Sequence, residues 1–134
     1  DRANAVKNNF LELQTKLNDA ITTYNEKTVA AGMQFVFVGA AGSEGSAYDA
    51  SLVLTGVNLS SQEAVITECE LVLPSGVTIH TETTPSGTIP SQHNYAKYWH
   101  LKCIEPIAGK IITVDVNYQI GGVVQPTHVA SVTL

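Results

Sequence analysis

Residues 110–120 read KIITVDVNYQI, and this stretch decides the fold because apolar and polar side chains alternate along it. Its apolar members are Ile112, Val114, Val116, Tyr118 and Ile120. Successive side chains of a β-strand point to opposite faces, so a period of two places these apolar residues on one side. The pattern predicts a strand with one face in a core and the other in water.

Two stretches upstream share this period. In residues 95–104, the side facing the core is expected to carry Trp99, Leu101 and Cys103, with His100 and Lys102 on the opposite side. In residues 64–73, the corresponding inward set is Val65, Cys69, Leu71 and Leu73, with Glu68 and Glu70 opposite. Both cysteines are therefore expected on inward faces.

Turn residues divide positions 33–134 into seven expected strands. The strands are 33–39, 50–59, 64–73, 76–83, 95–104, 110–120 and 123–134. Gly121 and Gly122 mark a tight hairpin, because glycine adopts the positive φ that such turns require. Seven short strands predict a mainly β fold, an immunoglobulin-like two-sheet sandwich.

The first 31 residues have a different period, in which apolar side chains recur at alternating spacings of four and three. We call this set the α-helical seam, and its members are Val6, Phe10, Leu13, Leu17, Ala20 and Tyr24. Gly32 is a typical helix stop. We therefore expect an N-terminal amphipathic helix over 1–31 and a sandwich over 33–134. The seam packs either on its own sandwich or on other copies in an oligomer or filament.

Composition and charge exclude several functions. Only 14% of the 134 residues are charged, and seven basic residues face twelve acidic ones, with Arg2 as the single arginine. Such a chain lacks the basic stripe that neutralises phosphates, so we expect no nucleic-acid partner. No window is apolar enough to span a membrane.

Motifs for catalysis and metal binding are missing from the sequence. It contains no GxSxG elbow, no P-loop and no CxxC pair, and its four histidines lack the i, i+4 spacing of a helical metal site. We expect no enzymatic activity, no cofactor and no metal site. The candidate functional residues are therefore structural or lie on the surface.

Cys69 and Cys103 permit one intramolecular bridge, and we expect it to form across the core; two buried free thiols are the alternative. Such a bridge indicates an oxidising compartment. Asn58, Leu59 and Ser60 form an N-glycosylation sequon at the end of an expected strand, where a sugar would face solvent.

Net charge is confined to the sandwich. Residues 1–33 hold four acids and four bases, which leaves eight acids and three lysines on the remainder and a net charge of −5 there. Glu68 and Glu70 give one outer face an acidic patch. We interpret it either as a solvated face or as a docking face for a basic partner.

The segment from Cys69 to Tyr118 carries, in order, LPSG, GTIP, a tryptophan strand, a glycine turn and VDVNY. In this it resembles the immunoglobulin-like modules of archaeal and bacterial cell surfaces, including CARDB-type adhesion domains. With the N-terminal helix added, the chain is similar to the archaellum stator proteins FlaF and FlaG. The resemblance implies an extracellular or pseudoperiplasmic domain anchored by a membrane helix upstream of Asp1.

The expected function is non-catalytic anchoring within an archaeal surface machine, as a homo-oligomer that binds surface-layer protein or other stator or filament subunits. One alternative is a type IV pilin or archaellin, whose helix lies in a filament core. A second is a secreted carbohydrate-binding or adhesion module with Tyr95, Tyr98 and Trp99 as a stacking platform.

Overall fold

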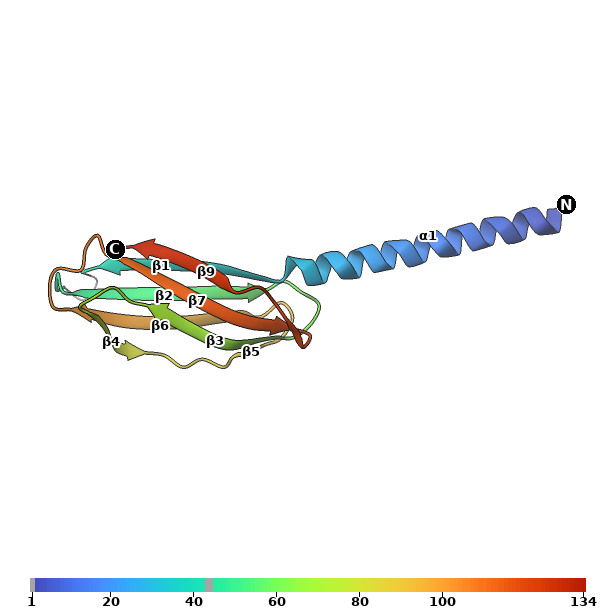
Figure 1. The fold of residues 1–134 in the computed structure, drawn as a ribbon. Helices are drawn as coiled ribbons and strands as arrows, with labels where there is room; N and C mark the ends of the chain where they lie inside the picture. The colour runs from blue at the N-terminus through green and yellow to red at the C-terminus, as the bar shows by residue number, and fades with distance from the viewer. Residues whose placement is uncertain (1, 43–44) are drawn as a thin grey trace.

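The computed structural model describes residues 2–42 and 45–134, with only the backbone described for residues 2 and 20–31. One helix, α1 (Arg2–Ala31), leads into two antiparallel sheets that pack face to face (Figure 1). The expected fold class, a mainly β sandwich after an N-terminal helix, is confirmed.

Sheet A has the strand order β1-β2-β6-β4. Its strands are β1 (Met33–Ala41), β2 (Asp49–Asn58), β4 (Val77–Glu82) and β6 (Asn94–Cys103). Sheet B has the order β5-β3-β7-β8, and β9 also pairs with β7. Its strands are β3 (Ala64–Val72), β5 (Thr88–Ile89), β7 (Ile111–Ile120), β8 (Val123–Val124) and β9 (His128–Thr133).

The core lies between the sheets and consists of the residues that the alternation places inward. In β7, Ile112, Val114 and Val116 are fully buried. Trp99 and Leu101 of β6 are buried opposite them in the other sheet. Burial of apolar surface at these positions is the main source of stability for the sandwich.

A β-bulge changes the predicted faces of β3. The register of β3 against β7 shifts between Ile66 and Glu68, so Thr67 is an extra residue in the ladder. Upstream of the bulge, Ala64 and Ile66 pack into the core, and the prediction that Val65 points inward with Cys69 is wrong. An uninterrupted period of two cannot anticipate this parity change.

The predicted strand at 123–134 is two strands, β8 and β9, which both pair with β7. Pro126 separates them because proline has no N–H to donate to the ladder. Gly121 and Gly122 have φ values of 55° and 78°, as expected for a tight hairpin between β7 and β8.

Helix α1 meets the sandwich through one residue, Gly32, which adopts a φ of 57° and ends the helix. The carbonyl oxygen of Gly32 accepts a hydrogen bond of 2.9 Å from the Leu59 N–H. The helix runs away from the end of the sandwich where β1 begins (Figure 1).

Candidate functional site

The seam of α1 faces solvent wherever the structure describes it. Val6, Phe10, Leu13 and Leu17 are 61–69% exposed. Four large apolar side chains at this exposure are not packed on the sandwich of their own chain. The side chain of Tyr24, also predicted in the seam, lies outside the described residues.

An acidic patch lies on the outer face of sheet B, where Glu68 and Glu70 were predicted. Both are exposed. Asp115, on the neighbouring strand β7, lies directly opposite Glu70 in the ladder. The pKa of Glu70 is raised above its ordinary value of 4.5, chiefly by the negative charge of Glu68 and also by Asp115. The Asn117 side-chain amide donates a hydrogen bond of 2.9 Å to Glu68. The carboxylates of the patch therefore repel one another.

The outer face of sheet A is a second candidate surface, which the sequence analysis missed. Register places its side chains in direct rows across three strands: Val38, Val53 and Tyr98 form one row, and Val36, Thr55 and Ala96 the next. Val36, Val38 and Tyr98 are 49–59% exposed. Open hollows of about 370 Å³ and about 350 Å³ lie over these rows.

A signal for this face was present in MQFVFV, residues 33–38, where valine alternates with phenylalanine instead of with a polar residue. Such a run is apolar on both sides of the strand. Phe35 and Phe37 pack against the core, which leaves Val36 and Val38 outward.

The predicted disulfide is wrong, because Cys69 and Cys103 are free thiols. Both belong to the core, as predicted, but they lie at different positions along the strands. The Cys69 thiol lies beside the Tyr95 hydroxyl. Tyr95 and Cys103 are eight residues apart on β6, or about 26 Å along an extended strand. A bridge needs Cα atoms within about 7 Å.

Burial raises the pKa of the Cys69 thiol above its ordinary value of 9.0, although Tyr95 and Lys97 act in the opposite direction. Burial is also the main cause that raises the pKa of Tyr95. The thiolate is the nucleophilic form of cysteine, so a raised pKa leaves Cys69 largely protonated and unreactive at neutral pH.

The prediction that Asn58 of the sequon faces solvent is also wrong. Asn58 is fully buried, and its side-chain nitrogen donates hydrogen bonds of 2.8 Å to the Gln62 carbonyl and 2.9 Å to the Ile89 carbonyl. Its side-chain oxygen accepts from the Ser60 N–H at 3.0 Å and the Ser60 hydroxyl at 2.7 Å. Because Ile89 belongs to sheet B, Asn58 clamps the two sheets together at the end near α1.

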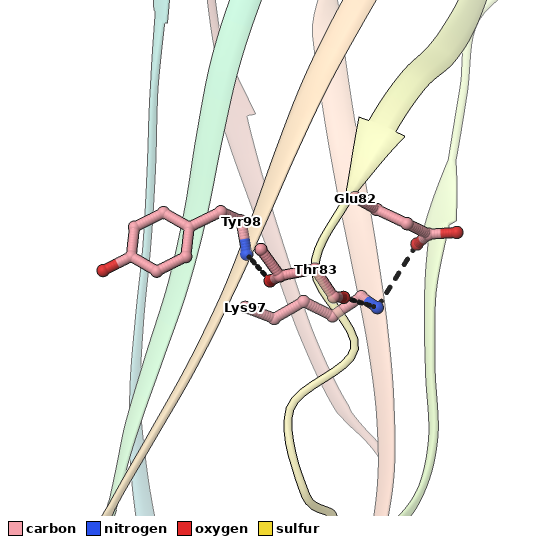
Figure 2. Close-up of polar contacts among 4 residues, drawn as sticks. All are labelled: Glu82, Thr83, Lys97 and Tyr98. Atoms are coloured by element: carbon pink, nitrogen blue, oxygen red, sulfur yellow. Dashed lines mark hydrogen bonds and ion pairs between the residues drawn. The ribbon is translucent and has the colours of Figure 1, made fainter.

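Lys97 is a buried cation on the inner side of β6. Its ammonium donates a hydrogen bond of 2.8 Å to the Thr83 carbonyl and lies 3.2 Å from the Glu82 carboxylate (Figure 2). The same ammonium lies 5.5 Å from the centre of the Trp99 ring. The Thr83 hydroxyl oxygen accepts a bond of 2.9 Å from the Tyr98 N–H, which holds the segment after β4 against β6. Lys97 therefore serves to close this edge of the sandwich.

The aromatic platform expected for sugar binding is not assembled. Trp99 is 2% exposed and Tyr95 is buried, whereas Tyr98 points outward. A sugar ring stacks on an accessible aromatic face, and only Tyr98 of the three offers one.

The histidines on sheet A face outward, with the rings of His80 and His100 in edge contact at 5.3 Å between centroids. The His100 Nε2 lies 3.7 Å from Asp49. Within residues 2–42 and 45–134, no group of three acidic, histidine or cysteine side chains is placed to hold a metal. In the same part of the chain, no helix has the length and apolar character needed to cross a membrane.

Comparison with known proteins gives a likeness of fold. No protein-family model and no curated protein sequence matches the chain. The GAE domain of GGA2p from Saccharomyces cerevisiae superposes with a TM-score of 0.61 and 15% identity, covering 77% of this chain and 89% of that one. The GAE domain of yeast GGA1 superposes with a TM-score of 0.57 and 15% identity, covering 77% of this chain and 91% of that one. The chain is thus similar to these domains in its β-sandwich.

Proposed function

We propose that this protein is a non-catalytic structural domain of an extracellular surface assembly, joined to neighbouring subunits through the seam of α1. The observation that carries the proposal is the exposure of Val6, Phe10, Leu13 and Leu17 on a helix that runs away from the sandwich. Burying one such side chain stabilises a contact by about 1.5–3 kcal/mol. A partner that covers the seam gains several such contributions.

The chemistry of the interior supports a structural function. Cys69 is protonated by virtue of its burial, and Lys97 is neutralised by Glu82 at 3.2 Å. Neither side chain is an activated nucleophile or base. These two side chains therefore fill space or close the edge of the sandwich.

Within this class we propose an archaellum stator of the FlaF and FlaG type, with a membrane anchor upstream of Asp1. The support is the order of sequence motifs from Cys69 to Tyr118 and the helix that precedes them. The acidic patch at Glu68 and Glu70 is the proposed binding face for a basic region of a surface-layer protein.

A type IV pilin or archaellin is the second candidate. It is favoured by the direct passage from α1 into β1 across Gly32, which lets a buried helix carry the sandwich at a filament surface. A carbohydrate-binding module is not proposed, because Trp99 is buried.

The test replaces two seam residues, Leu13→Asp with Leu17→Asp, and measures mass by sedimentation velocity over a range of concentrations. We expect the wild-type protein to form oligomers and the variant to be a monomer, because each carboxylate would be buried unpaired in the contact. A matched control, Leu11→Asp with Thr15→Asp, places the same charges on the opposite side of the helix and should leave assembly unchanged.

Emission of Trp99, the single tryptophan, reports whether the sandwich stays folded in both variants. A monomeric wild-type protein, or a seam variant that still forms oligomers, contradicts the proposal. Electron microscopy of the wild-type assembly separates the two candidates, since a pilin forms filaments in which the helices are packed in a central core.

A further inference from the structure

We propose that the seam of α1 docks on the outer face of sheet A of a second copy of this chain. This inference rests on the proposed function, which says that the seam is an assembly surface, and names the surface that receives it. The receiving face consists of the rows across β1, β2 and β6, whose members are Gln34, Val36, Val38, Ala40, Ser51, Val53, Thr55, Val57, Asn94, Ala96, Tyr98 and His100.

The two surfaces match in size. From Val6 to Leu17 the seam is about 17 Å long at 1.5 Å per residue. From Gln34 to Ala40 the face is about 20 Å long, and its outer strands are about 10 Å apart. A helix with its side chains is about 10–12 Å across, so one helix covers the three strands. The contact then removes several hundred Å² per partner, on the order of the smallest specific interfaces.

Charge favours this pairing over contacts between sandwiches. The rows of the face contain no acidic residue, lysine or arginine, and His100 lies at one end of them, 3.7 Å from Asp49. Residues 1–33 carry four acids and four bases with no net charge. The remainder of each chain carries a net charge of −5, so two sandwiches repel one another when they approach. A helix of no net charge on a face without acidic residues brings apolar surface together without that repulsion.

The occupant must come from another copy. Leu17 and Gly32 are separated by 15 residues, or about 22 Å of helix, and α1 runs away from its own sandwich (Figure 1). The seam of one chain therefore cannot reach the face of sheet A in the same chain while the helix stays intact. A contact between two different surfaces is heterologous, so it adds copies in an open chain or closes a ring.

The test is a complementation experiment between two full-length variants. The seam variant carries Leu13→Asp with Leu17→Asp. The face variant carries Val38→Lys with Tyr98→Glu, two exposed positions on either side of Val53, and leaves net charge unchanged. Each variant alone should sediment as a monomer. An equimolar mixture should form a 1:1 complex that does not grow, because it combines one intact seam with one intact face.

The matched control is Val72→Glu with Val129→Lys, which makes the same change at two exposed positions on the outer face of sheet B and should assemble like the wild-type protein. Circular dichroism and Trp99 emission verify folding. If the double face variant does not fold, Tyr98→Lys alone replaces it, since Tyr98 is 55% exposed.

The outcomes separate this inference from the proposed function. If the face variant assembles like the wild-type protein while the seam variant is monomeric, the seam packs on other seams: the inference is wrong and the proposed function stands. If the seam variant assembles, or the wild-type protein is monomeric at every concentration, both are wrong. Monomeric variants that do not combine in the mixture also overturn the inference.

Discussion

The outer face of sheet A carries a patch rich in valine without acidic residues, and that of sheet B carries an acidic patch, although both sheets place alternate side chains in one shared core. On sheet A the outward row is Val38, Val53 and Tyr98. On sheet B the outward residues of the central strands include Glu68, Glu70 and Asp115. Inward positions are under the same packing constraint in both sheets, so the outward positions are where the two sheets are free to differ in function.

The largest expected effect is on the free energy of unfolding, and it distinguishes inward from outward positions. Replacing Ile112→Ala on the inner face of β7 should lower the free energy of unfolding by about 3–4 kcal/mol, because a fully buried side chain leaves a cavity. Val36→Ala on the outer face of sheet A should change it by less than about 0.5 kcal/mol. Urea denaturation measures both, and similar losses would show that the apolar outer face also supports the fold.

The clamp between the sheets gives the next effect. Asn58→Ala removes the donors to the Gln62 and Ile89 carbonyls and the acceptor for Ser60. The expected loss is about 2–3 kcal/mol, because buried polar groups are left unpaired. Equilibrium unfolding followed by Trp99 emission tests it. A loss below about 0.5 kcal/mol would mean that the two sheets are held at this end by apolar contacts alone.

Lys97 is a charged exception on the inner face of sheet A. Lys97→Ala should cost about 1–2 kcal/mol, since the Thr83 carbonyl loses its donor and the contact with Trp99 is lost. Lys97→Met keeps the aliphatic stem and should cost less. Thermal unfolding of the two variants makes the comparison, and equal losses would assign the whole effect to the ammonium group.

The smallest effect is electrostatic and belongs to sheet B. The raised pKa of Glu70 means that the folded protein holds this proton more tightly than the unfolded chain. Stability is therefore lost as pH rises from about 4.5 through the raised value. Glu70→Gln should be more stable than the wild-type protein at neutral pH, with the difference vanishing at low pH and in high salt.

Glu105→Gln is the control of opposite sign. Its hydrogen bond of 2.7 Å from Lys110 lowers the pKa of Glu105, so this carboxylate contributes stability above pH 4.5 that is lost on acidification. The substitution should lower stability at neutral pH. If Glu70→Gln lowers stability at neutral pH as Glu105→Gln does, the acidic patch is not a site of repulsion.

The sequence was sufficient for the fold class because the period of two in KIITVDVNYQI and YAKYWHLKC assigns faces without knowledge of neighbours. The sequence was also sufficient for the apolar side of the helix, because spacings of three and four residues assign one helix face without knowledge of neighbours. It was insufficient for the short strand β5 (Thr88–Ile89), which has only two residues and exists because it pairs with Ala64 and Val65.

Of the two candidate surfaces, one could be predicted from the sequence and the other could not. Glu68 and Glu70 were found from alternation, and the structure places them on one outer face. The apolar face of sheet A was missed because its members come from β1, β2 and β6, and no single segment contains a whole row. Only pairing between strands places Val38, Val53 and Tyr98 side by side.

The sequence by itself determined which side of each regular element is apolar, because that depends on local backbone geometry alone. Tertiary structure decided how far along the strands two inward residues lie from each other, and so kept Cys69 apart from Cys103. It also decided that Asn58 is buried, since its partner Ile89 is distant in the sequence and is brought to it by the packing of the two sheets. Register and packing are set by contacts between distant residues, which a local period does not encode.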